Sequence, residues 1–289
     1  MATVHKYQSH NETILTYRHW QSHQGKDTAI ILIHGLASNY TRWSEFIEQT
    51  ILGKHWDIIA PDMRGHGDSM ARERLSMELW ADDLSALLRH AGYKKAVLIG
   101  HSLGAHIALH FAHRFPQQTA GLILIDPLSE NGFTATMRLV RRLRYLFQFL
   151  ISIIRLPRAI GLYRRKLPGR DLRKLDEEAR QILASGDTEA FAKHYSSPLS
   201  DLVHNSIGNY LQFVVEVLRP LPTLGHCEFP ALLLLSGGSS FNQDGTKHSL
   251  SHMCPQTQTT VIDANHWLLT EKPAESRQAI ESWFQEHFQ

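Results

Sequence analysis

One stretch of ten residues, Val97 to His106, constrains what this chain can fold into more than any other. It reads Val-Leu-Ile-Gly-His-Ser-Leu-Gly-Ala-His, so a β-branched apolar run leads into a Gly-x-Ser-x-Gly pattern. Small residues follow at helical spacing, at Ala105, Ala108 and Ala112. Glycines on both sides of a serine suit a strand that turns sharply into a helix, because the two elements approach too closely there for side chains. The stretch therefore predicts a strand, a bend that carries Ser102, and a helix.

Strands and helices alternate over most of the remaining chain. Continuous apolar runs at 29–33, 121–125 and 231–235 are typical of strands that a parallel sheet buries on both faces. Residues 78–91 and 273–288 carry apolar side chains at helical spacing. This alternation predicts an α/β fold, with a mostly parallel central sheet and helices on both of its faces.

The alternation stops between residues 128 and 229, where the pattern is mostly helical and is broken by prolines and glycines. It resumes with the apolar run at 231–235. We therefore predict a core formed by residues 1–127 and 230–289. Residues 128–229 would be a helical cap, or lid, inserted after the sixth strand.

Four positions of chemical interest lie at the C-terminal ends of predicted strands, namely Gly35, Ser102, Asp126 and His266. Open parallel sheets bind their ligands at the C-terminal ends of their strands. Separate parts of the chain are therefore expected to converge on one site.

Two backbone amides are candidates for binding an oxyanion in that site. The N–H of Leu103 starts the helix just past Ser102, where helix N-termini attract negative charge. The N–H of Leu36 follows Gly35, and a glycine after a buried strand lets backbone amides face a cavity.

These motifs together resemble the α/β-hydrolase superfamily over essentially the whole chain. The matching segments are His34-Gly35, Asp62-Met63-Arg64-Gly65-His66-Gly67-Asp68-Ser69, Gly100-His101-Ser102-Leu103-Gly104 and Asn265-His266-Trp267. The charged groups of the loop 62–69 are expected to fix that loop through hydrogen bonds rather than to take part in chemistry. The resemblance implies that Ser102 is a nucleophile, that His266 is its base, and that Leu36 and Leu103 form the oxyanion hole.

The serine at the bend, Ser102, limits the reactions that the resemblance implies. Haloalkane dehalogenases and epoxide hydrolases of this fold carry aspartate there, whereas serine favours acyl transfer to water. We therefore expect an enzyme that hydrolyses carboxylic esters with hydrophobic or lipid-like acyl groups and needs no cofactor or metal. A thioesterase, a C–C bond hydrolase and a ligand-binding homologue with little turnover remain as alternatives.

The third catalytic residue departs from the usual pattern of the superfamily. Ser240 stands where the acid normally follows the strand at 231–235. Two candidates remain, Asp126 and Asp244. We favour Asp126 because it ends a buried strand at the rim where Ser102 lies, as the acid does in some haloalkane dehalogenases. Asp244 precedes a glycine, a pair that is typical of turns.

The first half of the predicted cap is basic and amphipathic. Its basic residues are Arg138, Arg141, Arg142, Arg144, Arg155, Arg158, Arg164, Arg165, Lys166, Arg170, Arg173 and Lys174. The apolar residues between them recur at helical spacing, and Asp171 is the one acidic residue. One interpretation turns the apolar residues inward and leaves the basic face to solvent. The other makes the cap a surface for anionic lipid, an acyl carrier protein or an anionic substrate.

The net charge and the two cysteines give expectations about nucleic-acid binding and the cellular compartment. A formal net charge of +2 gives no case for nucleic acid. Cys227 and Cys254 match no metal or redox spacing and favour a reducing compartment. The polar start of the chain lacks the apolar stretch of a secretion signal. We therefore expect a cytoplasmic protein, peripheral at the membrane if the cap binds lipid.

Overall fold

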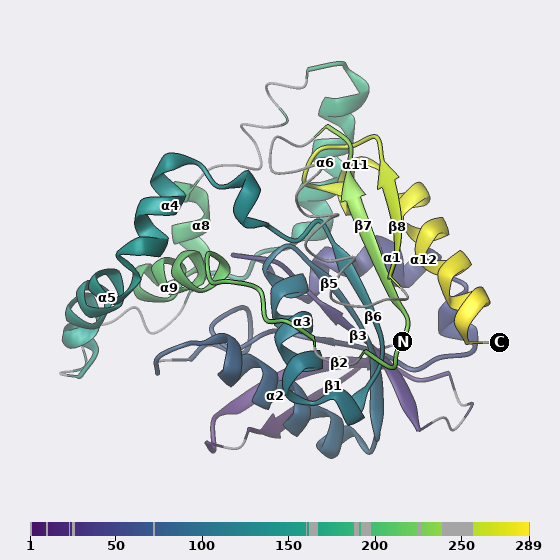
Figure 1. The fold of residues 1–289 in the computed structure, drawn as a ribbon, viewed down its shortest axis with the longest axis horizontal. Coiled ribbons are helices and arrows are strands. Elements are labelled where there is room, and N and C mark those ends of the chain that lie inside the picture. The colour runs from purple at the N-terminus through teal and green to yellow at the C-terminus, as the bar shows by residue number, and fades with distance from the viewer. Residues whose placement is uncertain are drawn as a thin grey trace.

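A sheet of eight strands, in the order β1-β2-β4-β3-β5-β6-β7-β8, forms the centre of the computed structural model (Figure 1). The structure describes residues 2–9, 11–22, 24, 27–71, 73–159, 161, 167–187, 191, 198–224, 227–238 and 257–288. The strands are β1 (Thr3–Gln8), β2 (Ile14–Trp20), β3 (Thr28–Ile33), β4 (Ile58–Pro61), β5 (Lys95–His101), β6 (Thr119–Ile125), β7 (Ala231–Ser236) and β8 (Thr257–Ile262). β1 and β2 form an antiparallel hairpin, β2 pairs antiparallel with β4, and the remaining pairs are parallel. The predicted fold class is confirmed.

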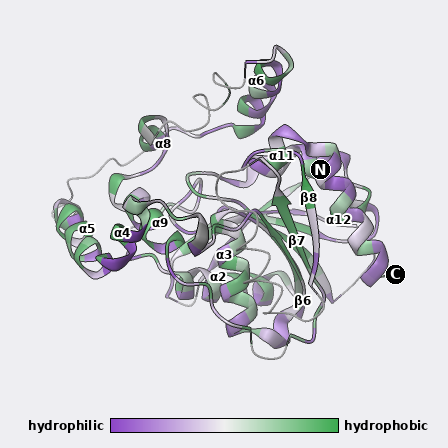
Figure 2. Ribbon diagram, turned by 45° about the horizontal axis from the view of Figure 1, so that its top comes forward, coloured by the Kyte–Doolittle hydropathy of each residue, from purple (hydrophilic) through white to green (hydrophobic). Residues whose placement is uncertain are grey.

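Apolar side chains alternate between the two faces of the sheet. Ile31 and Leu98 belong to one buried cluster, and Ile30 and Val97 to another. The first cluster is covered by α2 (Met77–Ala91) and α3 (Leu103–Arg114), the second by α1 (Ser44–Gln49) and α12 (Pro273–His287). Both faces are therefore dry, which explains why the central strands are continuously apolar; Figure 2 draws β7 in the hydrophobic colour.

Short helices complete the core around these layers. They are η1 (Tyr40–Trp43), η2 (Leu52–Lys54), η3 (Pro116–Gln118) and α11 (Leu268–Glu271). η1 begins beside the C-terminal end of β3, where the Asn39 side chain accepts a hydrogen bond from the N–H of Thr41. This hydrogen bond at the N-terminus of η1 fixes the loop that follows Gly35.

The connection between β6 and β7 is mostly helical in its described residues, and we call it the cap. Its helices are η4 (Glu130–Gly132), α4 (Ala135–Arg142), α5 (Arg144–Ala159), α6 (Leu172–Ala184), α8 (Pro198–His204) and α9 (Ile207–Val217). α4, α5, α8 and α9 form one group beside the sheet, and α5 packs against α9 (Figure 1). α6 lies apart from them and packs on η1 and α11. A helical cap after the sixth strand was predicted from the sequence.

The apolar residues of α4 and α5 are mostly exposed. Ile151 is buried, whereas Leu146, Phe149 and Leu156 face solvent. The interpretation that turns these residues inward is therefore wrong for most of α5, because only the stripe that contacts α9 is covered. The predicted basic residues Arg164, Arg165 and Lys166 lie outside the described residues.

Three further observations concern membrane spans, metal ligands and cysteines. Within the described ranges, no helix has the length and apolar character needed to cross a bilayer. In the same ranges, no three side chains of histidine, cysteine, aspartate or glutamate gather closely enough to bind a metal ion. Cys227 is disulfide-bonded, a state typical of oxidising compartments, which counts against the predicted reducing compartment.

Candidate active site

Ser102 lies on a strained bend between β5 and α3. Its φ of 54° and ψ of −117° are unusual for a residue with a side chain. A Cβ added to Gly100 would lie 2.3 Å from the carbonyl oxygen of Gly104, and one added to Gly104 would lie 2.2 Å from that of Ile33. Neither position admits a side chain, so the predicted close approach of strand and helix is confirmed.

A chain of hydrogen bonds joins Ser102 to His266 and His266 to Asp126. His266 lies between β8 and α11, with Nε2 3.0 Å from the Ser102 Oγ. Its Nδ1 is 2.6 Å from the Asp126 Oδ2. The serine O–H donates to Nε2 when Nδ1–H donates to the carboxylate. The structure thus brings together three residues that the sequence places far apart.

Asp126 is a buried carboxylate with polar partners on both oxygens. Its Oδ1 accepts hydrogen bonds from the backbone N–H of Ser236 at 3.0 Å and from the Ser236 hydroxyl at 2.8 Å. Burial alone would raise the pKa of Asp126, but the hydrogen bonds from His266 and Ser236 and the charge of His266 lower it overall. The carboxylate is therefore ionised at neutral pH and fit to orient His266.

Sequence reasoning missed Ser236. It ends β7, which pairs with β6, and Asp126 follows β6. The available signal was its place at the end of a buried strand, the same signal that marked Asp126. Strand order within the sheet decides that the two are neighbours, and strand order is not visible in the sequence.

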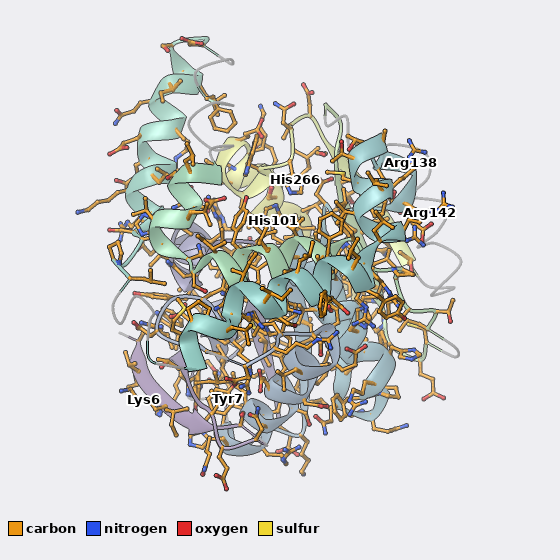
Figure 3. All side chains as sticks on the ribbon, turned by 90° about the vertical axis from the view of Figure 1, so that its left-hand side faces the viewer. Lys6, Tyr7, His101, Arg138, Arg142 and His266 are labelled. Carbon is orange, nitrogen blue, oxygen red and sulfur yellow. The ribbon has the colours of Figure 1, made fainter. Side chains whose placement is uncertain are left out.

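His101 is a second residue that the sequence analysis did not single out. Its Nε2 donates to the backbone carbonyl of His266 at 2.9 Å, and the centres of the two rings lie 5.1 Å apart. Figure 3 labels both residues. Burial and the charge of His266 lower the pKa of His101 to about 3, so the ring is neutral. His101 thus supports the turn that carries His266. It is the residue between Gly100 and Ser102 in the motif.

The amides of Leu36 and Leu103 are available to a ligand. Within the described part of the chain, neither N–H has a hydrogen-bond partner. A Cβ added to Gly35 would lie 3.4 Å from the Cβ of Ser102, so the Leu36 loop lies directly against the bend. Leu103 begins α3 immediately after Ser102. Both amides are therefore placed at the serine.

The cap holds the Leu36 loop in place. The Arg170 guanidinium donates to the carbonyl of Ala37 at 3.2 Å, and the Asn39 side chain donates to the carbonyl of Arg170 at 2.7 Å. Ala37 has a φ of 51°, a conformation that needs such support. Arg170 also forms a 2.6 Å ion pair with Asp201 of α8. The loop and the cap therefore depend on each other for their positions.

A cavity of about 300 Å³ opens at Ser102 and His266. Its apolar lining comes from both core and cap: Leu36, Leu128, Met137, Val214, Val217, Leu218 and Trp267. Two charged residues of the wall are paired, Arg42 with Asp176 and Asp201 with Arg170. The space beside the serine therefore favours an apolar group. Asp244, the alternative acid, lies outside the described residues.

Residues 28–273 match the family described as alpha/beta hydrolase fold. The chain belongs to this family.

The loop 62–69, one of the segments that resemble the superfamily, is held in place by hydrogen bonds. Asp62 accepts hydrogen bonds from the N–H of Tyr40 at 2.9 Å and of Asp68 at 3.0 Å, and Arg64 donates to Asp83 at 2.7 Å. These contacts fix the loop, as predicted.

The relatives of this α/β-hydrolase include an uncharacterized protein, a lipase and an epoxide hydrolase. The chain is 34% identical over 148 residues to an uncharacterized protein of Mycobacterium tuberculosis, covering 50% of this chain but only 42% of that protein. It is 26% identical to the sn-1-specific diacylglycerol lipase ABHD11 of Mus musculus, over 88% of this chain and 80% of the lipase. It is 24% identical to epoxide hydrolase 3 of Xenopus tropicalis, over 98% and 78% of the two chains.

Solved structures share the fold of this α/β-hydrolase. A thermophilic esterase from Thermogutta terrifontis superposes with a TM-score of 0.67, at 22% identity and over 100% of both chains. At this level of identity the likeness shows the fold alone.

Proposed function

We propose that this α/β-hydrolase is a serine hydrolase that cleaves carboxylic esters with hydrophobic acyl groups. The observation that carries the proposal is the hydrogen-bonded chain of Ser102, His266 and Asp126 at the mouth of an apolar cavity. A serine beside a histidine that a buried carboxylate orients is the arrangement that activates a hydroxyl for attack on a carbonyl.

The reaction would begin with the Ser102 Oγ attacking the ester carbonyl carbon while His266 Nε2 takes the hydroxyl proton. The negative charge on the carbonyl oxygen would be bound by the amides of Leu36 and Leu103, each such donor being worth about 3 kcal/mol. His266 would then protonate the leaving alcohol as the tetrahedral intermediate collapses to an acyl-serine.

Water would release the acid by the same route in reverse order. His266 takes a proton from the water as its oxygen attacks the acyl-serine, and returns it to the Ser102 Oγ as the carboxylic acid leaves. Asp126 stabilises the charged form of His266 in both halves of the reaction. Every proton and every bond is accounted for by these groups and one water.

Serine at the bend argues against epoxide hydrolysis, although epoxide hydrolases are among the relatives. An aspartate that opens an epoxide forms an ester, which water can then cleave. Ser102 opening an epoxide would form an ether, which has no carbonyl for water to attack. The enzyme would be blocked after one turnover.

The sequence left a ligand-binding homologue and a thioesterase as alternatives to an esterase. A ligand-binding homologue drew its support from the vacant acid position at Ser240, and Asp126 now supplies a carboxylate to His266 from another strand end. Thioesters and esters use the same catalytic groups, so a thioesterase is separated from an esterase by its substrates. The mouse lipase among the relatives adds support for an ester with a lipid-like acyl chain.

A substrate panel tests the proposal. Purified protein is assayed with p-nitrophenyl esters of increasing chain length, an acyl thioester and an epoxide. We expect kcat/KM to be highest for esters and to rise from acetyl to longer acyl chains. Ser102→Ala should lower it by at least about 10⁴-fold, whereas Ser282→Ala, which changes an exposed serine on α12, should not. A preference for the thioester or the epoxide would overturn the assignment to esters.

A further inference from the structure

A broad apolar stripe runs along the exposed side of the α4–α5 pair. α5 contacts α9 through the side on which Ile151 is 3% exposed. On its outer side, Phe149 is 62% exposed. The other exposed apolar residues of the pair are Leu139, Leu143, Tyr145, Leu146, Leu150, Ile153, Ile154 and Leu156. Contiguous exposed apolar surface of this kind marks a binding face rather than ordinary solvent-exposed surface.

Arginines border this stripe, and acidic residues are missing from it. Residues 135–159 contain six arginines and no aspartate or glutamate. Arg138 and Arg142 are exposed on α4, one turn apart, and have no side-chain partner within the described residues (Figure 3). Arg141 pairs with Glu130 at 2.6 Å, and Arg144 donates to the Tyr145 hydroxyl at 2.6 Å.

The same helices border the catalytic cavity. Met137 of α4 and Val214 of α9 line it, and α9 is the helix on which α5 rests. A ligand surface on the outside of α4 and α5 would therefore adjoin the wall of the cavity that holds Ser102.

We propose that the outer face of α4 and α5 docks on an anionic lipid bilayer. Apolar side chains such as Leu146, Phe149 and Ile153 would enter the boundary between headgroups and acyl chains. Arg138 and Arg142 would lie at the level of the headgroups, as in amphipathic helices that lie in a membrane interface. The proposal concerns a binding surface and goes beyond the esterase activity, so it stands or falls independently of that activity.

Charge decides between a bilayer and a second copy of the chain. Two such faces brought together would oppose arginine to arginine, with no acidic residue from 135–159 to pair them. An acidic protein would match the arginines but would also need an apolar face as long as this stripe. An anionic bilayer satisfies both features at once.

Vesicle sedimentation tests the arginines. The full chain carrying Ser102→Ala, which removes lipid hydrolysis as a complication, is mixed with phosphatidylcholine vesicles with or without phosphatidylglycerol. We expect binding only to the anionic vesicles and release at about 1 M salt, where charges are screened within about 3 Å. Arg138→Gln with Arg142→Gln should weaken binding about 25-fold, at about fivefold for each basic side chain. Lys54→Gln with Lys95→Gln removes the same charge from the exposed core surface and should have no such effect.

A second pair of variants tests the apolar stripe. Leu146→Ser with Ile153→Ser changes two side chains that are 50% and 45% exposed, and should weaken binding to anionic vesicles at least 10-fold. Ile14→Ser with Ile51→Ser changes side chains that are 55% and 44% exposed on the core, and should bind like the parent. Thermal unfolding of each variant establishes that it is folded.

Three results would overturn the proposal. The first is binding that ignores lipid charge and salt. The second is equal binding by each test pair and its matched control. The third is a dimer in solution, detected by sedimentation velocity, that the Leu146 and Ile153 changes dissociate, because this would assign the face to a second copy. The esterase activity is measured separately, as turnover of a soluble ester without vesicles, so its failure can be distinguished from a failure of membrane binding.

Discussion

Asp126 leaves β6 with a φ of 44°, a conformation that side chains rarely adopt. Such strain costs about 1–3 kcal/mol and persists where the surroundings determine it. Here the surroundings are His266 on one carboxylate oxygen and Ser236 on the other. The strained backbone thus aims the carboxylate at the histidine from the end of β6, rather than from the position that Ser240 occupies in the sequence after β7.

Replacing the acid tests this assignment at a single residue. Asp126→Asn keeps the shape of the side chain but removes the charge that holds the histidine tautomer, so turnover should fall about 10⁴-fold. Asp244→Asn should keep most of the activity. Steady-state kinetics on folded, purified variants measures both, and the reverse ranking would move the acid to Asp244.

The residues predicted from the sequence are those that follow recognisable strands. Ser102 and Asp126 come directly after β5 and β6, His266 follows the end of β8 by four residues, and the structure brings all three together. Ser236 and His101 were missed because their contacts depend on the pairing of β6 with β7 and on the fold of the His266 turn. Neither relation leaves a pattern in the sequence.

At the scale of elements, the site depends on how closely β3, β5 and α3 approach one another. Gly100 and Gly104 have neighbouring backbone within 2.3 Å of where a Cβ would be, so β5 and α3 are in contact through their main chains. Gly35 brings the β3 loop to the same place. These contacts set the distance between the Leu36 amide and Ser102.

A methyl group at Gly104 should separate these elements. Gly104→Ala would place a Cβ 2.2 Å from the carbonyl oxygen of Ile33, so backbone must shift, and we expect a loss of about 3 kcal/mol of unfolding free energy. Gly53→Ala is the control, because its Cβ would meet only the Ile58 side chain, at 3.7 Å. Denaturant unfolding compares the two, and equal stability would contradict the close approach.

The helices α4 and α5 of the cap show that helical spacing in a sequence does not reveal which side of a helix is buried. Helical spacing predicted that the apolar residues between Leu139 and Ile154 share a face, and the structure has helices there. Spacing does not tell whether a neighbouring element covers that face. α9 covers one stripe of α5 and leaves Phe149 and its neighbours exposed.

Across the whole molecule, several histidines are buried in neutral form. Burial lowers the pKa of His101 and His106 to about 3 and that of His110 to about 4. In the unfolded chain such rings titrate near about 6.5. Between these values the unfolded state binds more protons, so the free energy of unfolding rises with pH and is lost as the pH falls.

Acid should therefore destabilise the protein well above the range where most carboxylates titrate. Each such histidine contributes about 1.4 kcal/mol per pH unit, so these three predict a slope of about 4 kcal/mol per unit near pH 5. Burial raises the pKa values of Asp201 and Glu216, which opposes part of this slope. Urea unfolding between about pH 4.5 and 7 measures it, and His106→Gln should reduce it by about 1.4 kcal/mol per unit. An unchanged slope in that variant would show that His106 is not buried as a neutral ring.

The central claim is that the whole α/β-hydrolase fold serves to activate Ser102, and covalent labelling tests it most directly. The protein is treated with a fluorophosphonate, which reacts with an activated serine, and the modified peptide is sequenced by mass spectrometry. We predict one adduct, on Ser102, that Ser102→Ala abolishes and that Asp126→Asn forms far more slowly. No adduct on the folded protein, or an adduct that persists in Ser102→Ala, would contradict the account.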